Sequence, residues 1–368
     1  MKIICERKAL ADMLGIIARA SATKATNYIL ECCLLQADGE LLKIAANNLE
    51  YALVSDPLDV EVIESGAVVL ESRLLLDIVR KMPNDKLTIS ADNKHMTAIK
   101  SGSTEYVMPG LSADDFPPLP SMEGDRGFII PSAELKALIQ GTIFSISHDA
   151  SKPILAGELL EVDNEGVRMV AVDGFRISLR IFNGDYLSGG APIKAIIPGN
   201  ALKELVRLID GDDGVSVGIS GGHIIFGFNK ATMISRLVEG EYIAYNNMFS
   251  TDTKTAVVCV KGRLIDSLER ATLLSKDAKK HPVKLNLNEG LMSITSQTEL
   301  GTFYDELGIE QDGPDMEVAF NPRYLTDALK ATEGERVVMR FAGPLSPCVI
   351  KQEEGEDSKY LVLPLRLR

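Results

Sequence analysis

The sequence is poor in residues that bind metals or carry out redox chemistry. It contains no tryptophan, four histidines and five cysteines. The cysteines are odd in number and none forms a C-x-x-C pair, so we expect reduced core thiols, with no disulfide framework and no zinc site. The histidines are scattered, which argues against a metal cluster. These residues are Cys5, Cys32, Cys33, Cys259, Cys348, His95, His148, His223 and His281.

Long hydrophobic runs are also missing. No run approaches the ~18 apolar residues that a membrane-spanning helix needs. The apolar run at residues 3–5 is too short for a signal peptide, and charged residues follow it at once. We therefore expect a cytoplasmic protein with no membrane partner.

Catalytic motifs are absent as well. There is no G-x-x-x-x-G-K-[ST] loop, no strand–G-x-G-x-x-G–helix fingerprint and no G-x-S-x-G elbow. Ser145, His148 and Asp149 are close in sequence, but a catalytic triad needs defined positions in space, which neighbours at a helix end rarely provide. The sequence predicts a protein that is not an enzyme and needs no metal or cofactor.

One pattern recurs three times along the chain. A short strand and a polar or proline-containing break precede an amphipathic helix that begins near residues 7, 131 and 261, a spacing of ~125–130 residues that suits one domain per repeat. A second such helix begins near residues 72, 200 and 321. Ser72 and Asn321 are expected to cap their helices, and Pro322 suits a first helical position. The predicted helices are 7–20, 72–82, 131–146, 200–208, 261–275 and 321–330.

Short alternating segments, separated by turn residues, lie between these helices and predict antiparallel strands. The class is α+β, with two helices packed on the sheet of each block. Residues 112–125, which are rich in proline, and residues 250–254 are the expected boundaries. The predicted domains are 1–122, 123–250 and 251–368.

Charge is unevenly divided between the helices and the rest of the chain. The net charge is −13. The helical windows 7–20, 71–82, 131–148, 199–211, 261–276 and 321–332 contain 15 Lys/Arg and 9 Asp/Glu, so they carry +6 and the remainder carries −19. Basic residues often serve solubility alone, but that explanation does not predict so acidic a remainder. The division suits a polyanion held against the helices only.

Residues 171–179 contain a turn signal between two apolar runs. Asp173-Gly174 favours a tight turn, since glycine adopts a positive φ without steric cost. A plain hairpin corner is one interpretation. The other is that Arg176 and its apolar neighbours form the wall of a docking groove, and the local sequence does not decide between them.

Four stretches of the chain carry a distinctive motif each. They are Ala113-Asp114-Asp115-Phe116-Pro117-Pro118-Leu119-Pro120, Val172-Asp173-Gly174-Phe175-Arg176-Ile177, Phe320-Asn321-Pro322-Arg323-Tyr324-Leu325, and Tyr360-Leu361-Val362-Leu363-Pro364-Leu365-Arg366-Leu367. In this order, and with the threefold repeat, they resemble the bacterial DNA polymerase III beta subunit family, the sliding clamps, over the whole length.

This resemblance implies a fold and an activity. Three domains of the DNA-clamp fold would form a ring as a head-to-tail homodimer, with helices lining a hole around duplex DNA and sheets forming the outer wall. Contacts to phosphates would be sequence-independent and sensitive to salt. The ring would tether the replicative polymerase and confer processivity. The alternative is a ring-shaped scaffold of the same fold that is not dedicated to replication.

The resemblance also implies a groove that accepts a short hydrophobic motif. Its partners would be the DNA polymerase III alpha subunit, the clamp loader, and other polymerases and repair proteins. The groove residues, by motif position, are Leu155, Val172, Gly174, Phe175, Arg176, Ile177, Tyr324, Leu345, Pro347, Leu363, Pro364, Leu365 and Arg366. The family often has His, Pro and Arg where this chain has Phe175, Ile243 and Asn247, so we expect a more apolar and less cationic groove that prefers a more hydrophobic or less acidic motif.

Two further sets of residues follow from the resemblance by position. The expected DNA-facing residues are Lys24, Arg73, Arg80, Lys203, Arg207 and Arg323. The expected dimer-interface residues are Tyr106, Met108, Leu273 and Leu274. Gly199 and Asn200 stand where relatives carry basic residues, so that part of the lining should be weaker.

Overall fold

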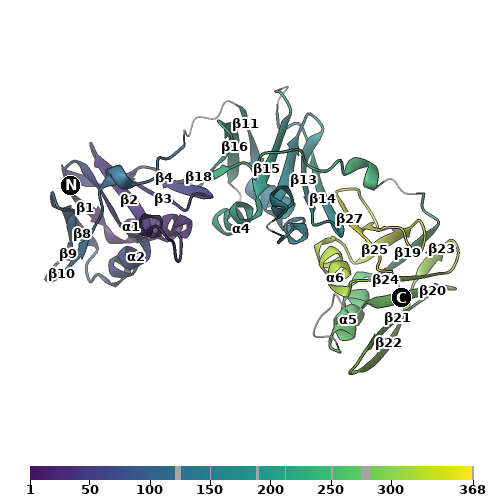
Figure 1. Ribbon diagram of the computed structural model, residues 1–368. Helices are drawn as coiled ribbons and strands as arrows, with labels where there is room; N and C mark the ends of the chain where they lie inside the picture. Colours follow the sequence, from purple (N-terminus) through teal and green to yellow (C-terminus); the bar gives the residue numbers. More distant parts are fainter. Residues whose placement is uncertain are drawn as a thin grey trace. The chain divides into compact units, whose positions relative to one another are not determined.

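Each α-helix in the described part of the chain follows directly on a β-strand. The computed structural model describes residues 1–120, 126–149, 151–187, 190–211, 213–249, 252–274 and 282–366 (Figure 1). Six strand–helix pairs occur within these ranges, which confirms the predicted pattern. They are β1 (Lys2–Glu6) with α1 (Arg7–Ile17), β7 (Gly66–Glu71) with α2 (Ser72–Lys81), β11 (Arg126–Pro131) with α3 (Ser132–Gln140), β15 (Ile193–Pro198) with α4 (Gly199–Leu208), β19 (Thr255–Val260) with α5 (Lys261–Thr272), and β24 (Met316–Phe320) with α6 (Pro322–Ala331).

The described residues form two compact units, each with two antiparallel sheets. Unit 1 comprises residues 1–135 and 200–237. Its five-stranded sheet has the order β10-β9-β8-β1-β6, and the path of its second sheet is β11-β16-β17-β18-β4-β3-β2-β7, with β5 paired to β3. The further strands are β2 (Cys32–Asp38), β3 (Leu41–Asn47), β4 (Tyr51–Ser55), β5 (Leu58–Asp59), β6 (Glu61–Glu64), β8 (Lys86–Ala91), β9 (Met96–Ser101), β10 (Thr104–Pro109), β16 (Gly214–Ser220), β17 (His223–Phe228) and β18 (Ala231–Arg236).

Unit 2 comprises residues 136–199 and 238–368. Its larger sheet has the order β15-β12-β13-β14-β27-β26-β25-β19-β23, and its smaller sheet the order β22-β21-β20-β24. The further strands are β12 (Gly157–Val162), β13 (Gly166–Val172), β14 (Arg176–Asn183), β20 (Val283–Asn288), β21 (Leu291–Thr298), β22 (Gly301–Gly308), β23 (Glu310–Asp312), β25 (Arg336–Phe341), β26 (Cys348–Gln352) and β27 (Ser358–Val362).

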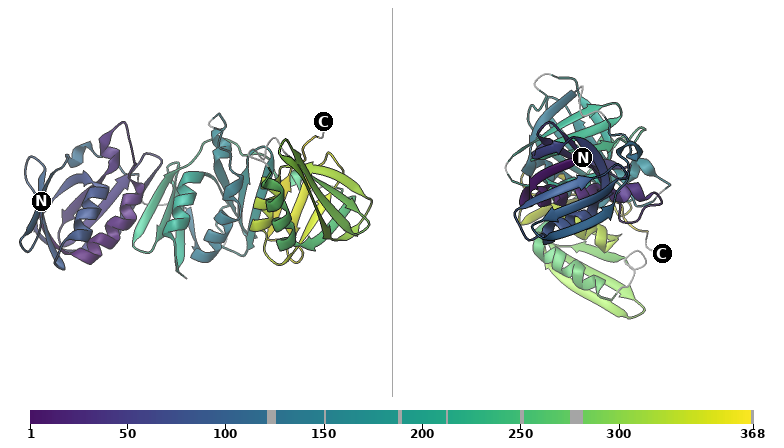
Figure 2. Two further views of the ribbon diagram at one scale, coloured as in Figure 1. Left: turned by 90° about the horizontal axis from the view of Figure 1, so that it is seen from below. Right: turned by 90° about the vertical axis from the view of Figure 1, so that its left-hand side faces the viewer.

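The helices pack in pairs on the sheets. Helices α1 and α2 lie side by side in unit 1, and α5 and α6 lie side by side in unit 2 (Figure 2). Helix α2 shows why its sequence is helical: Leu75 and Val79 are buried one turn apart, whereas Arg73 and Arg80 are exposed on the other face. This amphipathic pattern fixes which face of the helix remains for solvent or a ligand.

Strand pairing continues across the predicted domain boundaries. β18 pairs with β4 in antiparallel register, although the first domain was predicted to end at residue 122. In the same way β14 pairs with β27 across the boundary predicted near residue 250. The predicted sheets therefore do not stop at each block: neighbouring blocks share one sheet through backbone hydrogen bonds.

The structure corrects three predicted helix ends. Ser72 is not a cap, because it is the first helical residue and its buried hydroxyl bonds that of Ser21 at 2.6 Å. Glu71 caps α2 instead, and accepts from Arg73 N–H at 3.0 Å. Pro131 ends β11, and α3 stops at Gln140 rather than Ile146. Asn321 does cap α6, accepting from Arg323 N–H at 3.0 Å, and Pro322 takes the first helical position.

Candidate functional site

The Asp173-Gly174 sequence forms the predicted hairpin corner between β13 and β14. Asp173 Oδ1 accepts hydrogen bonds from Phe175 N–H at 2.8 Å and from Arg176 N–H at 3.1 Å. Gly174 has φ +93°, a value that a residue with a Cβ adopts only under strain. The turn leaves the Phe175 side chain 55% exposed, while Arg176 turns inward and is 8% exposed.

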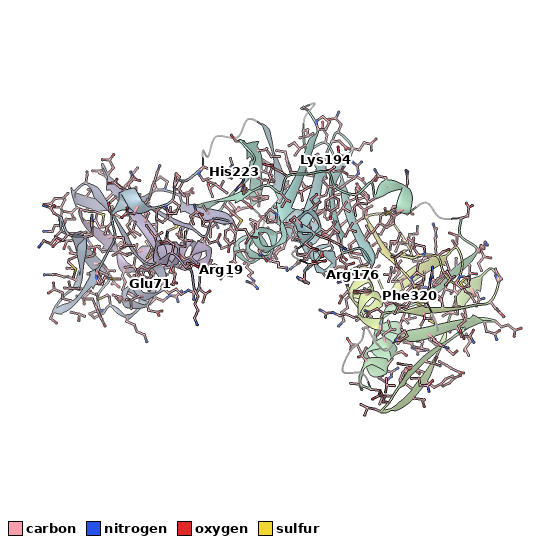
Figure 3. All side chains as sticks on the ribbon, in the orientation of Figure 1. Arg19, Glu71, Arg176, Lys194, His223 and Phe320 are labelled. Carbon is pink, nitrogen blue, oxygen red and sulfur yellow. The ribbon has the colours of Figure 1, made fainter. Side chains whose placement is uncertain are left out.

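Arg176 is held by a network of hydrogen bonds beneath the turn. Its guanidinium donates to Asp173 Oδ2 at 2.9 Å, to Asp327 Oδ2 at 2.6 Å and to the carbonyl oxygen of Phe144. It also lies 4.5 Å from the centre of the Tyr324 ring and 5.3 Å from that of Phe144. Figure 3 labels Arg176 where β14 approaches α6. Arg176 therefore supports the surface from below and offers little of its own area to a ligand.

Phe175 and Tyr324 form an aromatic surface above this network. Their ring centres are 6.1 Å apart and their planes differ by 24°. Burial raises the pKa of the Tyr324 hydroxyl, and the nearby Asp173 carboxylate adds to the effect. The Tyr324 ring also lies against the Arg176 guanidinium, so the two rings present an apolar face beside Arg176.

The C-terminal tail runs past this aromatic surface. Leu363 N–H donates to the Phe175 carbonyl at 2.9 Å, and Leu365 N–H donates to the Ala319 carbonyl at 2.8 Å. Leu363 is 37% exposed, Pro364 and Leu365 are half-buried, and Arg366 is exposed. Leu367, the end of the tail motif, lies outside the described residues. The tail is thus bonded both to the β14 corner and to β24.

The remaining predicted groove residues divide into a buried and an exposed group. Leu155, Val172 and Ile177 belong to one apolar cluster, with Ile243 packed against it. Leu345 is 70% exposed and Pro347 is half-buried in the loop between β25 and β26. A pocket of about 430 Å³ is lined by Leu345, Leu365 and Arg366, together with residues 317–319 and Pro344. All thirteen predicted groove residues lie in unit 2.

Four of the six predicted DNA-facing residues lie on exposed helix faces. Arg73, Arg80, Arg207 and Arg323 are exposed, Lys203 is half-buried, and Lys24 is exposed in a loop. Arg73 donates to Thr23 Oγ1 at 2.9 Å, which holds the loop of Lys24 against the start of α2. As delimited in the structure, the six helices contain 13 Lys/Arg and 7 Asp/Glu, so they keep the net charge of +6.

Arg19 is a basic residue that the prediction did not single out. It is exposed in the short helix Ala18–Ala20 and forms an ion pair with the buried carboxylate of Glu204 on α4. Glu204 also pairs with Arg207 at 3.2 Å. Two guanidinium groups therefore share one carboxylate and leave a net positive charge there. Arg19 lies inside a counted helical window, but no local pattern indicates its link to Glu204, 185 residues away.

Two of the predicted interface residues, Tyr106 and Met108, lie on β10, and the other two, Leu273 and Leu274, follow α5. β10 is an edge strand of its sheet, with Tyr106 44% and Val107 59% exposed. Met108, in contrast, is buried inside its own unit, so Val107 supplies the exposed apolar surface there. Leu273 follows α5 and is 81% exposed, and Leu274 is half-buried. Edge strand β22 carries Tyr304, which is 64% exposed.

The cysteines lie in the core, as predicted. All five are buried and unpaired with one another. Burial raises the pKa of the Cys5 and Cys259 thiols to about 12, so they stay protonated at neutral pH. In the described part of the chain, no helix has the length and apolar content to cross a membrane.

Comparison with known proteins gives a consistent result over the full length. Three family models match in order: the N-terminal, central and C-terminal domains of the DNA polymerase III beta subunit, at residues 1–120, 129–243 and 246–366. The beta sliding clamp of Synechocystis is 31% identical and that of Bacillus subtilis 27% identical, each with complete coverage of both chains.

Solved structures agree with this match. A structure from Eubacterium rectale, described as a DNA polymerase III beta subunit, has a TM-score of 0.95 at 34% identity, and the sliding clamp from Bacillus subtilis has a TM-score of 0.95 at 27% identity. A clamp from Pseudomonas aeruginosa bound to griselimycin has a TM-score of 0.91 at 28% identity. Each of these matches covers both chains completely. The chain therefore belongs to the DNA polymerase III beta subunit family, the beta sliding clamps.

Proposed function

We propose that this chain closes into a head-to-tail dimer around duplex DNA and tethers the replicative polymerase, acting in the cytoplasm without catalysing a reaction. The main support for this proposal is the uneven distribution of charge: the helices have a net charge of +6, whereas the whole chain has a net charge of −13. A ring lined by these helices attracts phosphates on the inside and repels nucleic acid from the acidic outside. Retention then depends on enclosure, and weak contacts suffice for sliding.

Two exposed edge strands suit the closure of such a ring. β10 carries Tyr106 and Val107, and β22 lies in the same unit as the exposed Leu273. An edge strand presents unpaired backbone groups that a second copy can pair with. Pairing of β10 from one copy with β22 from the other would join unit 1 of one copy to unit 2 of its partner, head to tail. This interface also covers apolar side chains that are otherwise exposed.

The groove formed by Phe175, Tyr324 and the tail is the proposed site where the polymerase and other partners bind. Its surface around Phe175 and Tyr324 is largely apolar, and Arg176 beneath it forms ion pairs with Asp173 and Asp327. This composition favours a short hydrophobic motif over an acidic one. The partners that carry such a motif are the polymerase alpha subunit, the clamp loader, and other polymerases and repair proteins.

Retention on circular DNA tests the enclosure directly. The protein is loaded onto nicked circular duplex by a clamp loader and separated from free protein by gel filtration. We expect it to remain with circular DNA and to leave when a restriction enzyme linearises the circle. A scaffold of the same fold that does not serve replication would not be retained on the circle.

The charge division is tested by a matched pair of variants. Arg73→Ala removes an exposed charge from α2, and Lys194→Ala removes an exposed charge from strand β15. We expect Arg73→Ala to weaken DNA binding at 50 mM salt and to lower the salt dependence by about one unit of log–log slope. Lys194→Ala should change neither, and equal effects of both variants would contradict a helix-lined DNA path.

A further inference from the structure

Within the described residues, the outer edge of β24, beside the groove, is covered by the tail at one position, Ala319. β24 pairs with β20 on one side, and it is the last strand in the order of its sheet. Within the described residues, the tail alone donates a backbone hydrogen bond to the other side, from Leu365 N–H to the Ala319 carbonyl at 2.8 Å. A strand edge of this kind is a template for an additional strand.

The direction of the backbone groups on this edge follows from that bond. In an antiparallel sheet the N–H and C=O of one residue point to the same side. Because the Ala319 carbonyl faces the tail, Ala319 N–H and both backbone groups of Glu317 also face away from β20. Because Leu365 lies opposite Ala319, an extended segment running along the rest of β24 meets the N–H and C=O of Glu317.

The pocket at this edge shares residues with the predicted groove. It has a volume of about 430 Å³, and three of its lining residues, Leu345, Leu365 and Arg366, are also predicted groove residues. Leu345 is 70% exposed and provides an apolar surface opposite β24.

The pocket is lined by two charged side chains, Glu317 and Arg366, and within the described part of the chain only Glu317 lies near an oppositely charged group. The Glu317 carboxylate lies 3.8 Å from Lys284 Nζ. Arg366 is exposed and has no ion pair among the described residues. An acidic side chain on the incoming segment finds a partner in Arg366, and an apolar side chain finds one in Leu345.

We propose that the β24 edge binds an extended continuation of the same partner segment that fills the groove, added as a strand with alternating apolar and acidic side chains. This inference rests on the proposed function of the groove. Backbone pairing supplies affinity and the alternate side chains supply selectivity, which is how strand addition recognises peptides. The partner motif is then longer than the part that fills the apolar groove.

Peptide binding to the full-length protein tests this. The core probe is the tightest fluorescein-labelled hexapeptide from a library of Leu, Met, Phe, Gln and Ser. Two longer probes add Val-Asp-Val-Asp to its N-terminal or C-terminal end. We expect one longer probe to bind about 5- to 20-fold tighter by fluorescence anisotropy, in line with a few new hydrogen bonds.

Two measurements separate strand addition from unspecific attraction. Methylation of the backbone nitrogens that face β24 should remove the gain, and methylation of the alternate nitrogens should leave it. Glu317→Pro removes one edge N–H without touching the β20 ladder, since an edge strand tolerates proline there. It should remove the gain and keep the affinity of the core probe.

The possible failures are distinguishable. If the core probe binds and neither extension binds more tightly, or if methylation acts equally at all positions, strand addition is wrong and the groove stands. If the gain appears only in a chain that ends at Arg366, the edge belongs to the chain's own last residues, and the proposal is again wrong. If the core probe does not bind at all, the groove and this inference both fail.

Discussion

At the scale of single residues, Arg176 is the structural centre of the groove. It joins the β13–β14 corner to α6 through Asp173 and Asp327, and it carries the Tyr324 ring. A residue of this kind acts on a ligand through its neighbours. Losing it leaves the Asp173 carboxylate, which is 12% exposed, without its counter-ion, and this costs more than the ion pair contributes when intact.

Arg176→Ala should lower the free energy of unfolding by about 3 kcal/mol, since the largely buried carboxylate of Asp173 loses its guanidinium partner and keeps only backbone hydrogen bonds. The same variant should weaken peptide binding, because Tyr324 loses its support. Urea unfolding and fluorescence anisotropy measure the two effects. The matched control is Arg323→Ala: this neighbouring arginine is exposed and lies 3.9 Å from Asp327, so its removal should cost less than about 0.5 kcal/mol. Equal stability of both variants would contradict the role of Arg176.

Phe175→His should shift the motif preference of the groove without changing the fold. Phe175 is 55% exposed, so its replacement should leave the stability within about 0.5 kcal/mol. The loss of the stacked pair with Tyr324 should weaken an apolar hexapeptide about 3- to 10-fold, from 0.5–1.5 kcal/mol for an aromatic pair. An acidic, polar hexapeptide is the comparison. If it already binds the unaltered protein as tightly as the apolar one, the predicted preference is wrong.

The residue scale also shows where sequence reasoning stops. The Asp173-Gly174 turn was predictable, because its signal is local. The burial of Arg176 was not, because Asp327 and Phe144 are distant in sequence and only the folded chain brings them to β14. Glu71 took the capping role predicted for Ser72 for a similar reason: Ser21, 51 residues away, engages the serine hydroxyl.

At the scale of elements, the strand–helix pairs were predictable from periodicity and turn residues. The strand partners between blocks were not. The pairings β4–β18 and β14–β27 join segments separated by more than a hundred residues, and no pattern within one strand specifies such a partner. The groove depends on the β14–β27 pairing, because β27 leads directly into the tail and places it beside the β13–β14 corner.

The turn between β26 and β27 offers a pH test of this element. Lys351 and Lys359 both contact the Glu356 carboxylate, Lys351 being the stronger influence, and they lower its pKa to about 2. A lowered pKa in the folded state gives stability that is present above the ordinary value of about 4.5 and is lost as the pH falls towards 2.

Glu356→Gln should therefore reduce stability at pH 7, and the difference from the unaltered chain should disappear near pH 2. The Glu356 side chain is 61% exposed, so the effect should stay below about 1 kcal/mol. Urea unfolding between pH 2 and 7 measures it. An unchanged difference at both ends of this range would show that the lysine contacts do not act through the charge of Glu356.

At the scale of the whole molecule, the proposed ring makes the quaternary state measurable. The chain has a mass of 39.9 kDa, so the closed dimer should appear at about 80 kDa in sedimentation. Leu273→Asp places a charge on an apolar side chain that is 81% exposed in the single chain and covered in the proposed dimer. We expect this variant to sediment as a monomer, because a buried unpaired carboxylate is costly.

The control for the dimer is Leu41→Asp, an exposed apolar position on β3 that has no place in the proposed interface. It should sediment like the unaltered protein. A Leu273→Asp protein that remains a dimer at micromolar concentration would contradict the interface.

The strand pairings between blocks have a consequence for how such a ring opens. The proposed ring contains three strand pairings of the same kind. They are β4 with β18, β14 with β27, and β10 of one copy with β22 of the other. The first two are joined by continuous chain, so each strand meets its partner at an effective concentration of the order of millimolar. The third has no such tether and responds to dilution. Dilution should therefore separate β10 from β22. The β4–β18 and β14–β27 pairings should persist, because dilution does not change their effective concentration.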